Sequence, residues 1–350
     1  MRSYRKFFIS IAVLLIFFPL INLLVWKRFT ENLLTNKNYQ GGDLARMGYI
    51  YGSKVFRKSS CDLPVRHLEL ADYTNQAIHV LTIGDSFSNG GGAGRNSYYQ
   101  DYIASINNCN VLNLVPYQAI DNISALSMYA NNGYLENIKP KYVILEASEK
   151  LCIDLAHTVE FDAMTPLAEL AKQKKVDNRK KLPEVSFING GNFKFLLYSL
   201  LYNFSDHAFM SKVYMMDLRI PLFSVTNASK LLFLQDDIRK IPRADAKSVG
   251  LLNNNLNTLA DKLSAKGIKL YFMPCVDKYN LYREYIVKNR YPSSTFFEQL
   301  RKLPKRYTLI DTKAILAEEL KMGEKDVFYA DDTHWSCKGS EAIFCELLFK

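Results

Sequence analysis

Three apolar runs of strand length, separated by segments of helical character, constrain the fold of this chain more than any other feature. The runs cover residues 77–83, 109–115 and 141–147, and helical patterns at 97–106 and 122–131 separate them. Strands that alternate with helices form a parallel sheet covered by helices on both faces. The sequence therefore predicts an α/β domain built around a central parallel sheet.

The same alternation returns in the last third of the chain. Leucines at helical spacing predict a helix over residues 248–266. Strands are expected at 269–274 and near 307–310, with a loop at 275–279 and a final helix from about Lys338. The predicted sheet thus draws strands from both ends of the chain.

The N-terminus carries an uncharged run from residue 7 to residue 26, which is 26 − 7 + 1 = 20 residues long. A helix needs about 20 apolar residues to cross the hydrocarbon core of a bilayer. No small-x-small cleavage pattern precedes Lys27 and Arg28, so the run is expected to be an uncleaved anchor and not a signal peptide. We expect a single-pass protein of the inner (cytoplasmic) cell membrane, with its folded domain on the periplasmic or extracellular side.

Three parts are therefore expected along the chain. Residues 1–28 are expected to be the membrane anchor, residues 29–70 a linker or stalk, and residues 71–350 the large folded domain. Within that domain the strand–helix pattern blurs over residues 151–241, which are rich in Phe, Tyr and Leu. We expect this stretch to be an insertion with its own helices, or a long substrate-facing excursion.

Charge and cysteine usage exclude several classes of function. The net charge is +10, but the basic residues are spread along the chain, and the densest group, at 172–181, contains no interleaved aromatic residue. This pattern favours a solvated surface, so no nucleic-acid partner is expected. The six cysteines form no C-x-x-C pair and the histidines show no metal-ligand spacing, so neither a metal nor a cofactor is expected.

Candidate catalytic residues stand at opposite ends of the predicted domain. Ser86 belongs to a Gly-Asp-Ser sequence that directly follows the strand at 77–83, and ligands of parallel sheets bind beyond the carboxyl ends of strands. His334 lies 334 − 86 = 248 residues further on, directly after Asp331, Asp332 and one threonine. A serine nucleophile needs an imidazole to take its proton and a carboxylate to orient that imidazole. The sequence thus favours an acyl-transferring serine enzyme.

Each motif alone has a simpler interpretation. Gly, Asp and Ser are common in strand-to-helix turns for backbone reasons. The glycine-rich run at 90–94 lacks the Gly-Lys-Ser/Thr of a phosphate-binding loop, and a plain loop or flexibility beside an active site explains it better. A lone histidine beside a tryptophan is more often a packing residue. The conjunction of the motifs favours catalysis.

At these residues the chain resembles a known family. The sequence at 84–88, Gly-Asp-Ser-Phe-Ser, resembles the nucleophile block of the SGNH (GDSL-type) hydrolases, and 331–335, Asp-Asp-Thr-His-Trp, resembles their last block. The Asp-Thr-His-Trp sequence is similar to the alginate O-acetyltransferase branch, whose members are membrane-tethered or periplasmic and acetylate exopolysaccharides. The likeness covers about residues 77–150 and 248–350.

The chain departs from the family pattern at two blocks. Val115-Pro116-Tyr117 stands where the second block opens with glycine, and residues 146–150 replace the Gly-x-Asn-Asp block. These blocks supply oxyanion donors, so the resemblance does not identify them here. The acetyltransferase branch itself diverges at these blocks.

The resemblance implies an SGNH-hydrolase-like three-layer fold and a polysaccharide O-acetyltransferase that works through an acetyl-serine. Ser86 would be the nucleophile, His334 the base, and the Ser86 N–H an oxyanion donor. General SGNH spacing assigns the orienting carboxylate to Asp331, whereas the Asp-Thr-His-Trp match assigns it to Asp332, which we prefer.

Further expectations concern substrate and partners. By the same resemblance Trp335, Lys278 and Tyr279 are expected to bind substrate, and the acceptor is expected to be a polysaccharide. A multi-pass membrane acyltransferase is the expected source of acetyl groups. Two alternatives stay open: a membrane-anchored SGNH carbohydrate or lipid esterase, and a non-catalytic polysaccharide-binding module.

Overall fold

The computed structural model describes residues 2–35, 41–52, 55, 61–92, 94, 96–114, 120–164 and 185–349. The basic group at 172–181 and Val115-Pro116-Tyr117 lie outside the described residues.

The centre of the domain is a six-stranded sheet with the order β1-β3-β2-β4-β7-β8, in which every pair of neighbours is parallel. The strands are β1 (Leu68–Glu69), β2 (Val80–Ile83), β3 (Val111–Leu114), β4 (Tyr142–Ser148), β7 (Lys269–Cys275) and β8 (Thr308–Leu309). All residues of β2, β3 and β4 are buried, as expected of strands covered on both faces. The predicted α/β fold class is confirmed.

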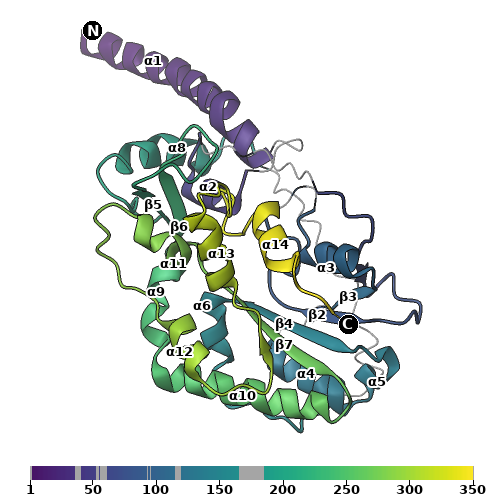
Figure 1. The fold of residues 1–350 in the computed structure, drawn as a ribbon. Coiled ribbons are helices and arrows are strands. Elements are labelled where there is room, and N and C mark those ends of the chain that lie inside the picture. Colours follow the sequence, from purple (N-terminus) through teal and green to yellow (C-terminus); the bar gives the residue numbers. More distant parts are fainter. Residues whose placement is uncertain are drawn as a thin grey trace.

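Two groups of helices flank this sheet (Figure 1). One group contains α4 (Asn122–Asn131), α10 (Ala246–Ser264) and α12 (Phe296–Lys302), in which α10 contacts both other helices. The other contains α3 (Tyr99–Asn107), α13 (Thr312–Lys321) and α14 (Cys337–Phe344), in which α14 contacts both other helices. Side chains from both groups join the strands in one continuous hydrophobic core. Short helices complete the domain: α5 (Tyr134–Ile138), α6 (Glu149–Cys152), η3 (Ile153–Leu155), α9 (Asp236–Arg239), η4 (Ile241–Arg243) and η5 (Arg283–Tyr285).

One predicted segment needs correction. The loop expected at 275–279 gives way to helix α11 (Lys278–Tyr282), all five residues of which are buried. Asp277 precedes the helix in an extended conformation, and the chain turns directly from strand β7 into α11. The side chains of α11 are largely polar or aromatic, so the sequence contains no apolar pattern from which this buried helix could be predicted.

Part of the expected insertion forms a second, antiparallel sheet. Strand β5 (Val213–Asp217) pairs with β6 (Lys230–Leu234), and Val213 and Leu232 pack on Leu44 of α2 (Asp43–Gly48) in a small separate core. Helix α2 belongs to the segment expected to be a linker. It therefore packs on the domain, although the division into anchor, linker and catalytic domain stays a prediction.

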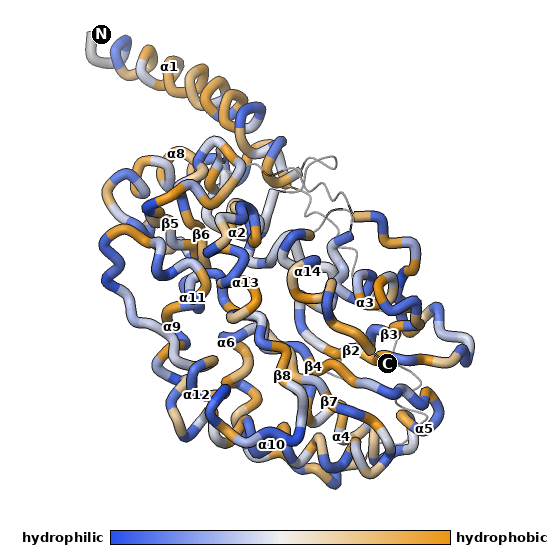
Figure 2. The backbone as a smooth tube through the Cα atoms, viewed as in Figure 1, coloured by the Kyte–Doolittle hydropathy of each residue, from blue (hydrophilic) through white to orange (hydrophobic). Residues whose placement is uncertain are grey.

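The N-terminal helix α1 (Arg2–Val25) continues into the π-helical η1 (Trp26–Thr35) and projects from the domain (Figure 1). The segment Tyr4–Leu34 is long and apolar enough to cross a membrane, judged by its length and composition. Its apolar residues run around the projecting helix, as Figure 2 shows in orange. One candidate membrane span thus precedes the α/β domain.

Candidate active site

Ser86 lies in a tight turn directly beyond the carboxyl end of β2. Its side chain is exposed, whereas the strand before it is fully buried. The backbone N–H of Gly91 donates to the Ser86 carbonyl oxygen over 2.8 Å and closes the turn. The turn therefore presents the Ser86 hydroxyl at the edge of the sheet where ligands of this fold class bind.

His334 approaches Ser86 from the other end of the chain. The His334 Nε2 atom lies 2.7 Å from the Ser86 Oγ, and its Nδ1 atom lies 2.6 Å from Asp332 Oδ1. Asp332 Oδ1 also accepts the backbone N–H of His334 over 3.1 Å, which fixes the ring relative to its carboxylate. The imidazole is 3% exposed. Hydroxyl, imidazole and carboxylate thus form one continuous hydrogen-bonded row.

The electrostatic surroundings favour a protonated His334. Burial by itself would lower the pKa of His334, but the Asp332 carboxylate, with smaller contributions from Asp43 and Asp85, raises it above the ordinary value of 6.5. An imidazole stabilised in this way accepts a proton from Ser86 more readily.

Asp43, from the N-terminal segment, completes the surroundings of the row. Its carboxylate accepts the backbone N–H of Thr333 over 2.8 Å and the Thr333 hydroxyl over 2.5 Å, and its own N–H donates to Asp332 Oδ2 over 3.1 Å. Burial, and next the Asp332 charge, raise the pKa of Asp43. Sequence reasoning missed Asp43 because no motif marks it.

Asp331 has a different set of contacts from Asp332. Its Oδ2 accepts the backbone N–H of Gly42 over 2.8 Å, and its carbonyl oxygen accepts the N–H of Ala45 over 3.1 Å. A side chain at Gly42 would begin 2.0 Å from the Asp331 carbonyl oxygen, so only glycine allows this approach. Asp331 thus joins α2 to the loop that carries His334.

Lys278 fixes the backbone of the loop that carries His334. Its buried ammonium group donates to the carbonyl oxygens of Tyr329, Ala330 and Asp332 over 2.6, 3.0 and 3.0 Å. Burial lowers the pKa of Lys278 to about 8, although the nearby Asp331, Asp332 and Asp43 charges oppose that shift. Three carbonyl oxygens match its three N–H donors. These three hydrogen bonds indicate that Lys278 stabilises the loop. The substrate contact expected for Lys278 stays a prediction.

A buried carboxyl group supports the Ser86 turn. Glu146 Oε2 accepts the backbone N–H groups of Asp85 and Ser88 and the Ser88 hydroxyl, over 2.9, 3.1 and 2.8 Å. Burial, and next the Asp85 charge, raise the pKa of Glu146 well above its usual range, whereas hydrogen bonds from Glu146, Ser148 and Phe87 outweigh burial and lower that of Asp85. Glu146 therefore holds its proton more strongly than an ordinary carboxyl group does, and Asp85 holds its proton less strongly. Glu146 stands where the family has its Gly-x-Asn-Asp block, and that departure was the signal that could have pointed to it.

The glycine run after Ser86 lets the backbone pass close to the imidazole. A Cβ atom at Gly91 would lie 2.2 Å from both Cδ2 and Nε2 of His334, and one at Gly92 would lie 2.8 Å from the Tyr329 ring. Gly92 also has a φ of +87°, which disfavours other residues. Close approach to His334 therefore explains this part of the run.

The other two side chains expected to bind substrate face the interior. Trp335 is 5% exposed and packs on Phe87 with ring centroids 4.4 Å apart, while Phe87 also contacts the His334 ring at 4.6 Å. Tyr279 is buried, and its hydroxyl donates to the Pro292 carbonyl oxygen over 2.8 Å. Trp335 thus packs on Phe87, which in turn supports the His334 ring. Substrate binding by either residue stays a prediction.

Asp43, Asp332 and His334 offer ligand atoms within 4.8 Å of one another, a spacing that a metal ion could use. The same atoms form the hydrogen bonds described above, and those bonds account for their closeness.

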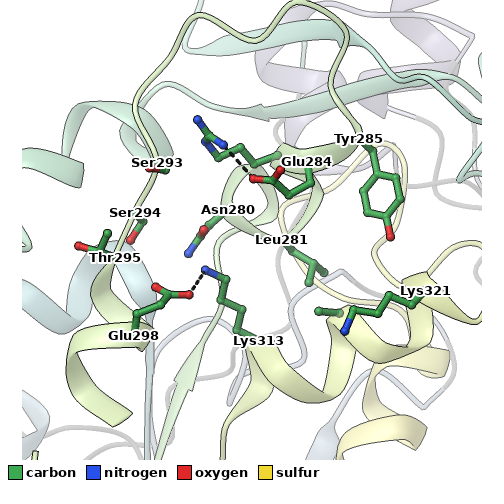
Figure 3. Close-up of a pocket in the computed structure, with 12 residues that line it drawn as sticks. Asn280, Leu281, Glu284, Tyr285, Ser293, Ser294, Thr295, Glu298, Lys313 and Lys321 are labelled. Atoms are coloured by element: carbon green, nitrogen blue, oxygen red, sulfur yellow. Dashed lines mark hydrogen bonds and ion pairs between the residues drawn. The ribbon is translucent and has the colours of Figure 1, made fainter. Parts of the chain in front are cut away.

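A pocket of about 420 Å³ lies between α11, α12 and α13 (Figure 3). Its charged side chains pair within the protein: Lys313 with Glu298 over 2.8 Å, and Arg283 with Glu284 over 2.9 Å. None of the catalytic candidates lines it. It therefore adds nothing to the chemistry at Ser86.

Comparison with known proteins agrees with the predicted branch. The family model of the SGNH hydrolase-like domain of acetyltransferase AlgX matches residues 211–345. The match spans 345 − 211 + 1 = 135 residues, less than half of the chain, and it contains His334 but not Ser86. It begins inside the stretch where no likeness was expected. No curated protein matches the chain.

Proposed function

We propose that this protein is an O-acetyltransferase that moves acetyl groups onto hydroxyls of an exported or cell-surface polysaccharide through an acetyl-Ser86 intermediate. The observation that carries the proposal is the continuous row of Ser86 Oγ, His334 and Asp332, with contacts of 2.7 and 2.6 Å. The match to an acetyltransferase domain supports the reaction class.

In the first step His334 Nε2 takes the Ser86 hydroxyl proton while Ser86 Oγ attacks the acetyl carbonyl carbon of the donor. The tetrahedral intermediate collapses, the bond from carbon to the donor's leaving atom breaks, and His334 returns the proton to that atom. In the second step His334 takes the proton of a sugar hydroxyl, whose oxygen attacks the acetyl-Ser86 carbonyl carbon. On collapse the bond from the carbonyl carbon to Ser86 Oγ breaks and His334 returns the proton to that oxygen, which forms the sugar ester and restores the Ser86 hydroxyl. Asp332 keeps Nδ1 protonated throughout, so Nε2 is the atom that takes and returns each proton.

The oxyanion of each intermediate needs preorganised donors. Within the described part of the chain, no group accepts the Ser86 backbone N–H, so it is free to donate to the oxyanion. The family's second donor would stand at about 115–117, outside the described residues.

Transfer is favoured over hydrolysis by the acetyltransferase match and by the Asp-Thr-His-Trp sequence. A membrane-bound enzyme that acetylates outside the cytoplasm needs a supply of activated acetyl groups. A multi-pass membrane acyltransferase is the partner that this chemistry requires, and the apolar N-terminal helix would hold the two in the same membrane.

The test uses purified full-length protein, 4-nitrophenyl acetate as donor and short uronate oligosaccharides as acceptors. We expect nitrophenol release together with acetylated oligosaccharide detected by mass spectrometry. Ser86→Ala should abolish both, because it removes the proposed nucleophile. It should still fold, because only one exposed hydroxyl is lost. Ser264→Ala, at the exposed end of α10, should change neither.

The alternatives give different results in the same assay. Nitrophenol release with free acetate and unmodified sugar would identify an esterase. No release by the unmodified protein would favour the non-catalytic module.

A further inference from the structure

Helix α8 (Gly190–Leu201) is apolar on both faces. Toward the domain, Phe195 and Tyr198 are buried. The outer face of α8 points away from the domain. Its residues follow the helical spacing i, i+3, i+4 and i+7 and are 46–56% exposed: Phe193, Leu196, Leu197 and Leu200. A helix that is apolar all round is typical of a protein core or a membrane. The outer face thus has the apolar pattern of a buried face, yet about half of its surface is exposed in the described part of the chain.

This helix is fixed beside α1 by specific contacts. The rings of Phe18 and Phe193 stack with centroids 5.5 Å apart. Asn22, which is 2% exposed, donates from its side chain to the Phe187 carbonyl oxygen over 3.0 Å and accepts from Asn192 Nδ2 over 2.8 Å. These bonds satisfy the amide of Asn22 within the apolar run. Figure 1 shows α8 next to the base of α1.

The length of α1 decides how deep α8 must lie. From residue 7 to Phe18 there are 12 residues, which at about 1.5 Å per residue span only ~18 Å. The hydrocarbon core is about 30 Å thick, so the spanning segment must continue to about Trp26. Phe18, and with it Phe193, then lies inside the apolar layer.

We propose that the outer face of α8 lies among the acyl chains of the membrane beside α1, so that the domain is held by one spanning helix and one in-plane helix. The proposal rests on α1 crossing the membrane and is independent of the chemistry at Ser86. The charges agree with it. Lys194, the one charged residue of α8, turns its ammonium group over the Tyr49 ring at 5.3 Å, and Lys27 and Arg28 are exposed where the apolar run ends.

The test places a tryptophan reporter on the outer face of α8. Leu197→Trp and a control, Leu251→Trp, are made in the full-length protein and inserted into phosphatidylcholine vesicles that contain phosphatidylcholine with a nitroxide on its acyl chain. Leu251 is a residue of α10 and is 37% exposed. Helix α10 lies at the end of the domain away from α1 (Figure 1). The unmodified protein gives the background of Trp26 and Trp335.

The nitroxide should remove most of the added fluorescence of Leu197→Trp and leave that of Leu251→Trp unchanged. Labels in the upper part of the acyl chain should quench best, because in-plane helices lie about 5–10 Å into the boundary. Equal, weak quenching of both reporters would overturn the proposal. A Leu197→Trp reporter that is shielded only at high protein density would mean that a second copy covers the face, which also overturns it.

Discussion

Asp331 and Asp332 are neighbours in the chain, yet their carboxylates serve different parts of the molecule. Asp332 binds the imidazole of His334, and Asp331 binds the backbone of Gly42. The spacing in the sequence left both open as the orienting acid. The geometry favours the assignment to Asp332 that the Asp-Thr-His-Trp match implied.

Asp332→Asn should therefore be the damaging variant. An amide at this position leaves His334 in the wrong tautomer, and in the best-studied serine triad this costs about 10⁴ in turnover. Asp331→Asn keeps an acceptor for the Gly42 N–H and should lose about tenfold at most, by the usual small effect of a conservative change away from the reacting groups. The measurement is acetyl-ester turnover at a pH where His334 is neutral. The reverse order would assign the orienting role to Asp331.

Gly91 offers a second test at the scale of single residues. Gly91→Ala pushes a methyl group into the His334 ring, and a displacement of about 1 Å at a catalytic group can cost about 10²-fold in rate. Gly250→Ala is the matched control, because its added methyl group meets nothing within 4 Å in the middle of α10. Turnover is compared together with melting temperature. A fully active Gly91→Ala protein would show that this loop does not fix the imidazole.

At the scale of elements, α2 matters most for the site. Its first residue, Asp43, holds Thr333, and its Ala45 packs with Phe195 of α8 and Val25 of α1. A six-residue helix thus lies between the candidate membrane span and the catalytic loop. The segment expected to be a linker supplies part of the site.

Asp43→Asn should change the pH dependence of turnover as well as its rate. His334 must be neutral to act as a base, so the rate should rise with pH through a pKa above 6.5. Removing the Asp43 charge lowers the pKa of His334 and should move this acid limb to lower pH. The lost hydrogen bond from the Thr333 hydroxyl should cost about 10- to 10²-fold in rate. Asp62→Asn, at an exposed acid, is the control. An unchanged acid limb would limit Asp43 to a role in folding.

Strands β2, β3, β4 and β7 could be predicted because each is a short, largely buried apolar run. Their predicted ends lie within three residues of those observed. Helix α4 matches the prediction at both ends. The short strands β1 and β8 have little apolar pattern, and only β8 was expected. Helix α11 was missed because its buried side chains are largely polar or aromatic, as Lys278 shows.

Some residues of the candidate site could also be predicted from the sequence, and others could not. Ser86, His334 and Asp332 follow from chemistry that needs those residue types. Asp43, Glu146 and Gly91 act through contacts between segments far apart in the chain. Glu146 left a trace as a departure from a family block and Gly91 as part of the glycine-rich run, whereas nothing marked Asp43. Such contacts have no local pattern in the sequence.

At the scale of the whole molecule, the contacts form a connected path from the candidate membrane span to the site. The apolar N-terminal helix contacts α8, α8 packs on α2, and α2 holds the loop that carries His334. The domain would thus stand at a defined orientation to the membrane in which the proposed acetyl-supplying partner would reside. This arrangement suits an enzyme that receives its acyl group from a neighbour.

The most direct test of the account is to trap the acyl-enzyme. Full-length protein is mixed with 4-nitrophenyl acetate without acceptor, quenched in acid, digested and analysed by mass spectrometry. The account predicts the mass of one acetyl group on the peptide that contains Ser86, with fragment ions that place it on Ser86. The label should be absent in Ser86→Ala and should disappear when an acceptor sugar is added before quenching. An acetyl group on another residue, with turnover unchanged in Ser86→Ala, would contradict the account.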